Sequence, residues 1–377
     1  MLPIQTGKPR VGPQAAAHSP SAAASSNDEQ ALSVFKLMSD SAEELTQALS
    51  GRAQEKKLRE RRRAETRPDG LNSEESEEAL AFFSAEREGK DGGDPKLRVD
   101  QQARSLAALL RENPDLARQH SREGGGDDTE RYLLLHQVAD RLARGDFGPD
   151  PGRRAETAAR EAAAEIYAER AGRIHADLNT LPALRALGDE ARELRSDYRD
   201  IVFGDATVAD FMRQMLDRVP ENQPEKFSAM LDAAREAAGL DLAAARPSAD
   251  PVRLRALVSD LSHMKVIGTV MERCGELSQT LADRHGVESP PTATRITREL
   301  LAITSDRWVD ASRFTRIAED LGVQTPPSAG VDFLAGTRAA LRDLPPQVYQ
   351  SAEARDAILD AAQAALDRAI DVEEGLA

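Results

Sequence analysis

The amino-acid sequence predicts an all-α protein. Ala, Leu, Glu and Arg dominate its 377 residues, while aromatic residues make up only 4% of the chain. From about residue 75 onward, apolar residues recur at the spacing of one helix face, and no segment shows the alternation of a strand. Short connections and few aromatics for one large core favour an elongated rod of three consecutive small helical bundles after a disordered N-terminal segment.

Clusters of Pro, Gly, Asn and Asp divide the helical part of the chain. We expect a disordered N-terminal segment over 1–72, because its first 28 residues contain few large apolar side chains that could offset the entropy of ordering. Three helical bundles are expected to follow, and each of the first two ends in its longest helix. The predicted bundles span 73–180, 181–287 and 288–377.

One short stretch inside the N-terminal segment has a helical apolar stripe. Leu32, Phe35 and Met38 follow one another at intervals of three residues between polar neighbours. An apolar stripe of this kind is normally buried against another surface. Two such surfaces are possible: the protein's own body and an external partner. Residues 52–68 come next and are rich in Arg and Lys. We interpret them as a solvated linker helix and not as an arm for nucleic acid or anionic lipid, because charges of both signs occur and no aromatics are interleaved.

Charge and cysteine content exclude several classes of function. Asp and Glu outnumber Lys and Arg by 65 to 50, which gives a net charge of −15. Nucleic acid and anionic membrane surfaces repel such a chain. No apolar run approaches the roughly 18 residues of a membrane span, and no secretory signal peptide is recognisable. The single cysteine, Cys274, excludes an internal disulfide and is expected to be a buried helix residue.

A search for catalytic motifs finds none. The glycines of "REGGGDD" lack the Lys and Ser/Thr of a phosphate-binding loop, and neither G-x-S-x-G nor H-E-x-x-H occurs. The histidines are scattered singly at His18, His120, His136, His175, His263 and His285. We therefore expect no enzymatic activity, no cofactor and no metal site.

The last 90 residues contain clear helix boundaries. The spacing of Ile296, Leu300 and Ile303 predicts a first helix. Asp310 is placed to cap a second helix, and Gly322 to end it. Further helices are expected over "GVDFLAGTRAALRDL" and after Ser351. The apolar stripe expected for the last helix consists of Ile358, Ala362, Ala365, Leu366, Ala369 and Ile370.

These features occur in the order of a known family. A helix leads into "RW", a capped helix ends in "IAEDLGV", and "FLAGTRAALRDLP", "VYQSAEARDAILDAAQAALDRAI" and "DVEE" follow. This region, about Ile303 to Glu374, resembles the TyeA module of the type III secretion gatekeepers, the YopN/TyeA, InvE and MxiC family. Upstream stretches such as "YRDIVFGDATVADFMRQML" resemble the HrpJ-domain body of these gatekeepers more loosely.

The resemblance implies a protein that controls the order of export, with translocators leaving before effectors. Its implied partners are the export-gate protein, chaperone–translocator complexes and an N-terminal secretion chaperone, with no nucleic acid and no direct membrane insertion. The implied location is the bacterial cytoplasm, peripheral to the apparatus at the inner membrane. The resemblance also implies a secretion signal and a chaperone-binding stretch within residues 1–72, and export of the chain itself remains open. The alternative functions are a secreted effector and a helical scaffold delivered by the same apparatus.

Five residues are candidates for partner contact: Leu32, Phe35, Met38, Trp308 and Tyr349. Trp308 is the only tryptophan, and it lies between the first two helices of the C-terminal module. We expect its indole to cover the ends of those helices, so that Trp308→Ala would cost stability before it cost binding. The alternative is that Trp308 anchors a partner, since Trp is over-represented at binding hot spots.

Overall fold

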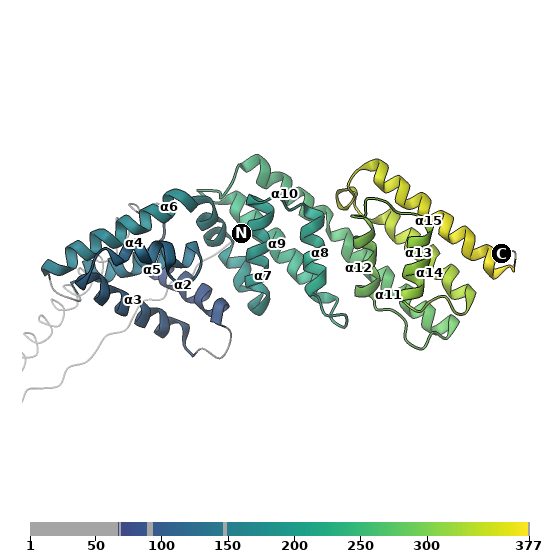
Figure 1. The fold of residues 1–377 in the computed structure, drawn as a ribbon, viewed down its shortest axis with the longest axis horizontal. Helices are drawn as coiled ribbons and strands as arrows, with labels where there is room; N and C mark the ends of the chain where they lie inside the picture. Colours follow the sequence, from purple (N-terminus) through teal and green to yellow (C-terminus); the bar gives the residue numbers. More distant parts are fainter. Residues whose placement is uncertain (1–66, 68, 89–92, 146–148, 376–377) are drawn as a thin grey trace, which may run out of the picture. The chain divides into compact units, whose positions relative to one another are not determined.

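A computed structural model describes residues 67, 69–88, 93–145 and 149–375. The chain divides into two units, Met1–Asn72 and Ser73–Ala377. The second unit contains all the helices considered below. Helices are the only regular secondary structure among the described residues, and no strand occurs there (Figure 1). This confirms the predicted all-α class. Most of the predicted disordered segment, including Leu32, Phe35 and Met38, lies outside the described residues.

The first group of helices surrounds its own set of buried side chains. Phe83, Leu110, Tyr132 and Leu133 are almost completely removed from solvent. Asp94 caps α3 by accepting a hydrogen bond from the Lys96 amide at 3.0 Å. The helices are α2 (Ser73–Glu88), α3 (Pro95–Glu112), α4 (Leu116–Glu123), α5 (Asp128–Ala143) and α6 (Pro149–Arg185).

Helix α6 is longer than the sequence indicated. The first bundle is predicted to end at residue 180, but α6 continues through Pro182 to Arg185, with one non-helical residue at Arg170 (φ −128°, ψ 16°). Helix α6 packs against α5, and it also contacts α7 and α9. Tertiary packing therefore overrides the local helix-breaking tendency of Pro182. The predicted boundary at 180/181 falls inside α6, and the division into three bundles stays a prediction.

The remaining helices share one apolar core. Its buried side chains run from Ala176 on α6 to Ala365 on α15 and include Cys274, as expected. The buried side chains of α2 to α5 are not part of this core, although Phe82 packs against its edge. The helices are α7 (Ala191–Phe203), α8 (Val208–Arg218), α9 (Glu225–Ala243), α10 (Pro251–His263), α11 (Lys265–His285), α12 (Ala293–Ile303), α13 (Ala311–Asp320), α14 (Pro327–Asp343) and α15 (Ala352–Glu373), with short 3₁₀ helices η2 (Gly188–Glu190) and η3 (Pro346–Val348).

A buried carboxylate ties α6, α7 and α9 together. Asp241 on α9 has no exposed surface. Asn179 donates to one of its oxygens at 2.7 Å and the Tyr198 hydroxyl to the other at 2.8 Å. The Ser248 amide and hydroxyl donate as well. Four donors satisfy the two oxygens of Asp241, and no ion pair is found for it among the described residues, so hydrogen bonds stabilise this buried side chain.

The helix boundaries predicted near the C-terminus are confirmed. Asp310 accepts hydrogen bonds from the Ser312 and Arg313 amides at 3.0 and 3.2 Å. Gly322 adopts φ 70°, and the next amide, that of Val323, donates to the Ala318 carbonyl at 2.9 Å. Within the described part of the chain, no helix combines the length and apolarity that crossing a membrane requires.

Candidate partner-binding surface

Trp308 lies in the connection between α12 and α13 and is 87% exposed. The expectation that it covers the adjoining helix ends is therefore wrong. Other contacts already close this corner: the Asp306 amide donates to the Ile303 carbonyl at 3.0 Å, and Gln350 donates to the Ser305 carbonyl at 2.6 Å. Val309 packs against the core in place of the indole. Trp308 is left pointing into solvent on a connection that hydrogen bonds hold in place.

Tyr349 has the opposite environment. Its side chain is only 7% exposed, and its hydroxyl donates to the Leu341 carbonyl. Burial raises the pKa of this phenol to about 12, against the lowering effect of Arg355. These contacts indicate that Tyr349 is a packing residue close to the start of α15. Its role in partner contact stays a prediction. Leu32, Phe35 and Met38 lie outside the described residues.

An open apolar groove lies between α13, α14 and α15. We call it the α13–α15 groove, and its volume is about 610 Å³. Its apolar lining consists of Ala318, Gly330, Leu334, Ala365, Ala369 and Val372. Small residues line much of it, so a ligand can approach the helix backbones closely. Val372 is a large apolar residue with 55% of its surface exposed. The groove therefore presents apolar surface to solvent in the same module as Trp308.

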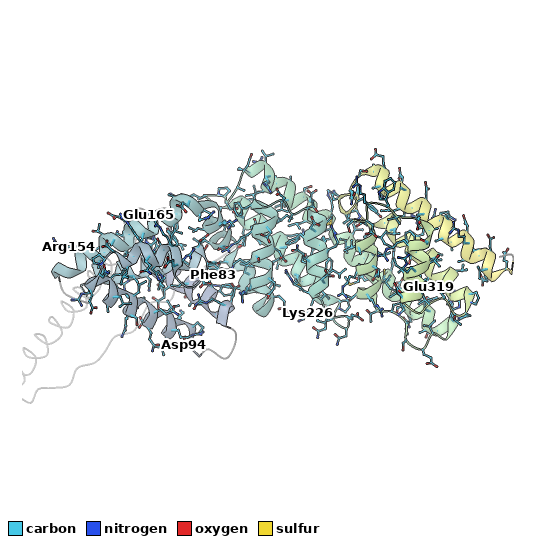
Figure 2. The ribbon with its side chains drawn as sticks, in the orientation of Figure 1. Phe83, Asp94, Arg154, Glu165, Lys226 and Glu319 are labelled. Atoms are coloured by element: carbon cyan, nitrogen blue, oxygen red, sulfur yellow. The ribbon has the colours of Figure 1, made fainter. Side chains whose placement is uncertain are left out.

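The rim of this groove is mainly basic. Arg316 on α13 and Arg368 on α15 line it, together with Glu319. Glu319 is labelled in Figure 2, on the C-terminal module. Both arginines are exposed, and no ion pair is found for either among the described residues, whereas Arg313 pairs with Asp306 at 3.3 Å. The apolar residues predicted for the last helix correctly indicated the apolar face of α15. They did not indicate that the C-terminal end of this face lies open to solvent in the groove.

A second polar feature joins α2 and α5 to α6 and α7. We call it the α2–α7 ion cluster, and it consists of Glu86, Arg87, Asp127, Glu130, Asp177, Arg195 and Arg199. Arg87 donates to Glu130 at 2.7 Å, and the Arg195 guanidinium lies 4.3 Å from the centre of the Phe83 ring. Arg195 and Arg199 both pair with Asp127, at 2.9 and 2.7 Å. The cluster borders a cavity of about 410 Å³.

Burial sets the protonation of this cluster. Both carboxylate oxygens of Glu86 are buried and have no hydrogen-bond partner among the described residues, and Nε of Arg195 lies 3.5 Å from Oε2. Burial raises the pKa of Glu86 to about 7, since the attraction of Arg195 only partly opposes it. Burial and the nearby Asp127 charge likewise raise the pKa of Glu130 to about 7. For Asp127, burial acts in the same direction, but Arg195 and Arg199 outweigh it and lower its pKa.

No sequence signal pointed to the ion cluster. Its members are far apart in the chain, and charged residues occur on nearly every helix, so none stands out individually. Within the part of the chain that the structure describes, no three His, Cys, Asp or Glu side chains gather in a way that could hold a metal ion. Two of the described histidines have structural contacts: Nε2 of His285 is hydrogen-bonded to Asp332 at 2.8 Å, and the His136 ring packs edge-on against Tyr132.

Comparison with known proteins now identifies the C-terminal module. Residues 294–375 match the TyeA family. The resemblance predicted from the sequence is thereby confirmed for this module. No match is found among curated proteins.

The fold of most of the chain is shared with a solved structure. Methylated MxiC of Shigella flexneri matches 80% of this chain and 99% of its own, with a TM-score of 0.60 and 15% identity. CopN of Chlamydia pneumoniae matches 77% of this chain and 99% of its own, with a TM-score of 0.45 and 14% identity. CopN in the CopN–Scc3 complex matches 71% of this chain and 94% of its own, with a TM-score of 0.45 and 16% identity. The MxiC match extends the likeness well beyond the TyeA module.

Proposed function

We propose that this chain is a type III secretion gatekeeper that controls the order of export. The observation that carries the proposal is the TyeA match over residues 294–375, at the C-terminal end of a fold shared with MxiC along 80% of the chain. A gatekeeper acts by holding partners and releasing them. The protein is accordingly a regulator and not an enzyme, and it works in the bacterial cytoplasm beside the apparatus at the inner membrane.

The C-terminal module is the part that we assign to the export gate. Trp308 supplies the anchor, because an exposed indole on a fixed connection loses little conformational entropy when it binds. Arg307 beside it is exposed and can form a polar rim. Chaperone–translocator complexes and an N-terminal secretion chaperone are the further partners proposed from the resemblance.

The proposal is tested by the proteins found in culture supernatants. Strains with the wild-type gene, a full deletion, a truncation lacking residues 288–377, and Trp308→Ala are compared at equal assembly of the apparatus. We expect the deletion and the truncation to raise effector export under non-inducing conditions and to reduce translocator export. Trp308→Ala should do the same while leaving protein levels unchanged.

Val252→Ala is the matched control, because Val252 is also a large apolar residue with most of its surface exposed, but lies on α10. This variant should export like the wild type. Supernatants that are identical for the wild type, the deletion and the truncation would refute the gatekeeper proposal and favour the secreted effector. A normal profile for Trp308→Ala alone would refute only the role of the indole.

A further inference from the structure

The cavity beside the α2–α7 ion cluster is lined by an excess of cations. Its volume of about 410 Å³ falls in the range of small-molecule sites, roughly 300–1,000 Å³. Two acidic residues line it, Asp127 and Glu130, at the N-terminal end of α5. Arginines in the lining outnumber these carboxylates by four to two, and they are Arg87 of α2 and Arg192, Arg195 and Arg199 of α7.

Helix geometry explains why three of these arginines share one cavity. Arg192, Arg195 and Arg199 follow the i, i+3, i+7 spacing of one helix face, and Ser196 lies on the same face. This face of α7 borders the cavity together with Asp127, the N-cap residue of α5. The N-terminal end of a helix carries partial positive charge, so α5 adds to the attraction of the guanidinium groups for an anion.

Two of the arginines keep donor capacity that the ion cluster does not use. Arg192 is exposed, and no ion pair is found for it among the described residues. The Arg195 side chain is only 9% exposed, and its Nη1 has no hydrogen-bond partner in the described part of the chain, since Oδ2 of Asp177 lies 3.9 Å away. Arg199 differs, because it pairs with both Asp127 and Asp177. Arg192 and Arg195 can therefore donate to a further acceptor.

The net charge at the cavity depends on two carboxyl groups. Burial raises the pKa of Glu86 and of Glu130 to about 7. Toward pH 6 both carboxyls therefore take up a proton, while the arginines keep their charge. A bound anion would favour this protonation further, so the anion and the protons bind together. The charged groups that face the two carboxyls are Arg87, Asp127, Asp177, Arg195 and Arg199.

We propose that this cavity binds the phosphate group of a small molecule, with Arg192 and Ser196 supplying donors from its exposed side. Guanidinium groups suit phosphate, because their planar forks donate paired hydrogen bonds to its oxygens. A phosphate dianion also matches the excess of two positive charges in the lining, which a single carboxylate would only half neutralise. The lining comes from α2, the start of α5 and α7, so the bound anion would strengthen the connection among these elements.

Isothermal titration calorimetry on the full-length purified protein tests the site, with the ionic strength held constant by sodium chloride. The probes are sodium sulfate, inorganic phosphate and glycerol 3-phosphate. Sulfate keeps both charges at pH 6 and at pH 8, so its pH dependence reports protonation of the protein alone. Arg192→Gln removes the exposed guanidinium. The matched control is Arg255→Gln on α10, since Arg255 is likewise exposed and no ion pair is found for it among the described residues.

Sulfate should bind about tenfold more tightly at pH 6 than at pH 8, because protonation of the two carboxyls accompanies binding. Arg192→Gln should weaken the binding of sulfate about tenfold at pH 6, since a charge-assisted hydrogen bond is lost. Arg255→Gln should bind like the wild type. Tighter binding of glycerol 3-phosphate than of inorganic phosphate would identify an ester as the ligand, and the reverse order would identify the free ion.

Three results would overturn the proposal: no saturable binding of any probe, an affinity that does not increase toward pH 6, or an affinity that Arg192→Gln leaves unaltered. The readout does not involve secretion, so its failure is distinct from failure of the gatekeeper function.

Discussion

Glu86→Gln is expected to make the protein more stable at alkaline pH, because this carboxylate is buried without hydrogen bonds. Its pKa rises from 4.5 to about 7 in the folded protein. A carboxyl whose folded pKa is raised binds its proton more tightly when folded, so the free energy of unfolding falls as pH increases between 4.5 and 7. A shift of this size corresponds to about 3 kcal/mol at pH 8 and to almost nothing at pH 4.5.

Glutamine keeps the shape of the protonated acid and cannot ionise. Glu86→Gln should therefore raise the free energy of unfolding by about 3 kcal/mol at pH 8 and change it little at pH 4.5. Glu130, whose pKa is also about 7, keeps part of the pH dependence in the variant. The control is Glu236→Gln on α9, an exposed position, which should stay within about 0.5 kcal/mol at both pH values.

Urea unfolding followed by circular dichroism measures the effect at the two pH values. Tryptophan fluorescence is a poor probe here, because the single indole is already exposed in the folded state. A variant that is less stable than the wild type at pH 8, or one stabilised equally at both pH values, would contradict this account of the ion cluster.

Two further predictions concern Asp241 and Trp308. Asp241→Ala should lower the free energy of unfolding by about 3 kcal/mol in a urea titration, because it leaves buried donors such as Tyr198 without an acceptor. The control is Asp356→Ala at an exposed position, which should change the free energy of unfolding by less than about 0.5 kcal/mol. Trp308→Ala should also stay within about 0.5 kcal/mol, and the emission maximum of wild-type Trp308 should barely move when urea unfolds the protein. A marked red shift on unfolding would show that the indole is covered.

Local signals in the sequence were sufficient for the C-terminal module. A cap such as Asp310 and a terminator such as Gly322 act through their own backbone neighbours, so the residues that form them are close together in the sequence. The continuation of α6 through Pro182 could not be predicted in this way. It depends on packing against α7 and α9, whose contacts are set by the tertiary fold.

The candidate surface was predicted only in part. The sequence identified Trp308 as exceptional, but an indole beside two helix ends can turn inward or outward, and the choice depends on whether other side chains already fill the corner. Val309 and the hydrogen bond from Gln350 do so here. The α13–α15 groove was harder still, because Ala369 fits a buried stripe and an open one equally well. Only the arrangement of three helices decides which it is.

The distribution of apolar contacts indicates where the second unit can change its internal arrangement. From Ala176 to Ala365 one apolar core is continuous, so the helices around it must move together or lose buried surface. Helices α2 to α5 contribute only Phe82 to the packing around that core, but they also pack on α6, and the α2–α7 ion cluster adds ion pairs to α6 and α7. Ion pairs respond to protonation, whereas apolar contacts do not. Loss of the ion pairs to α7 would therefore leave the packing on α6 and the core from Ala176 to Ala365 in place, and the C-terminal module with Trp308 would keep its structure.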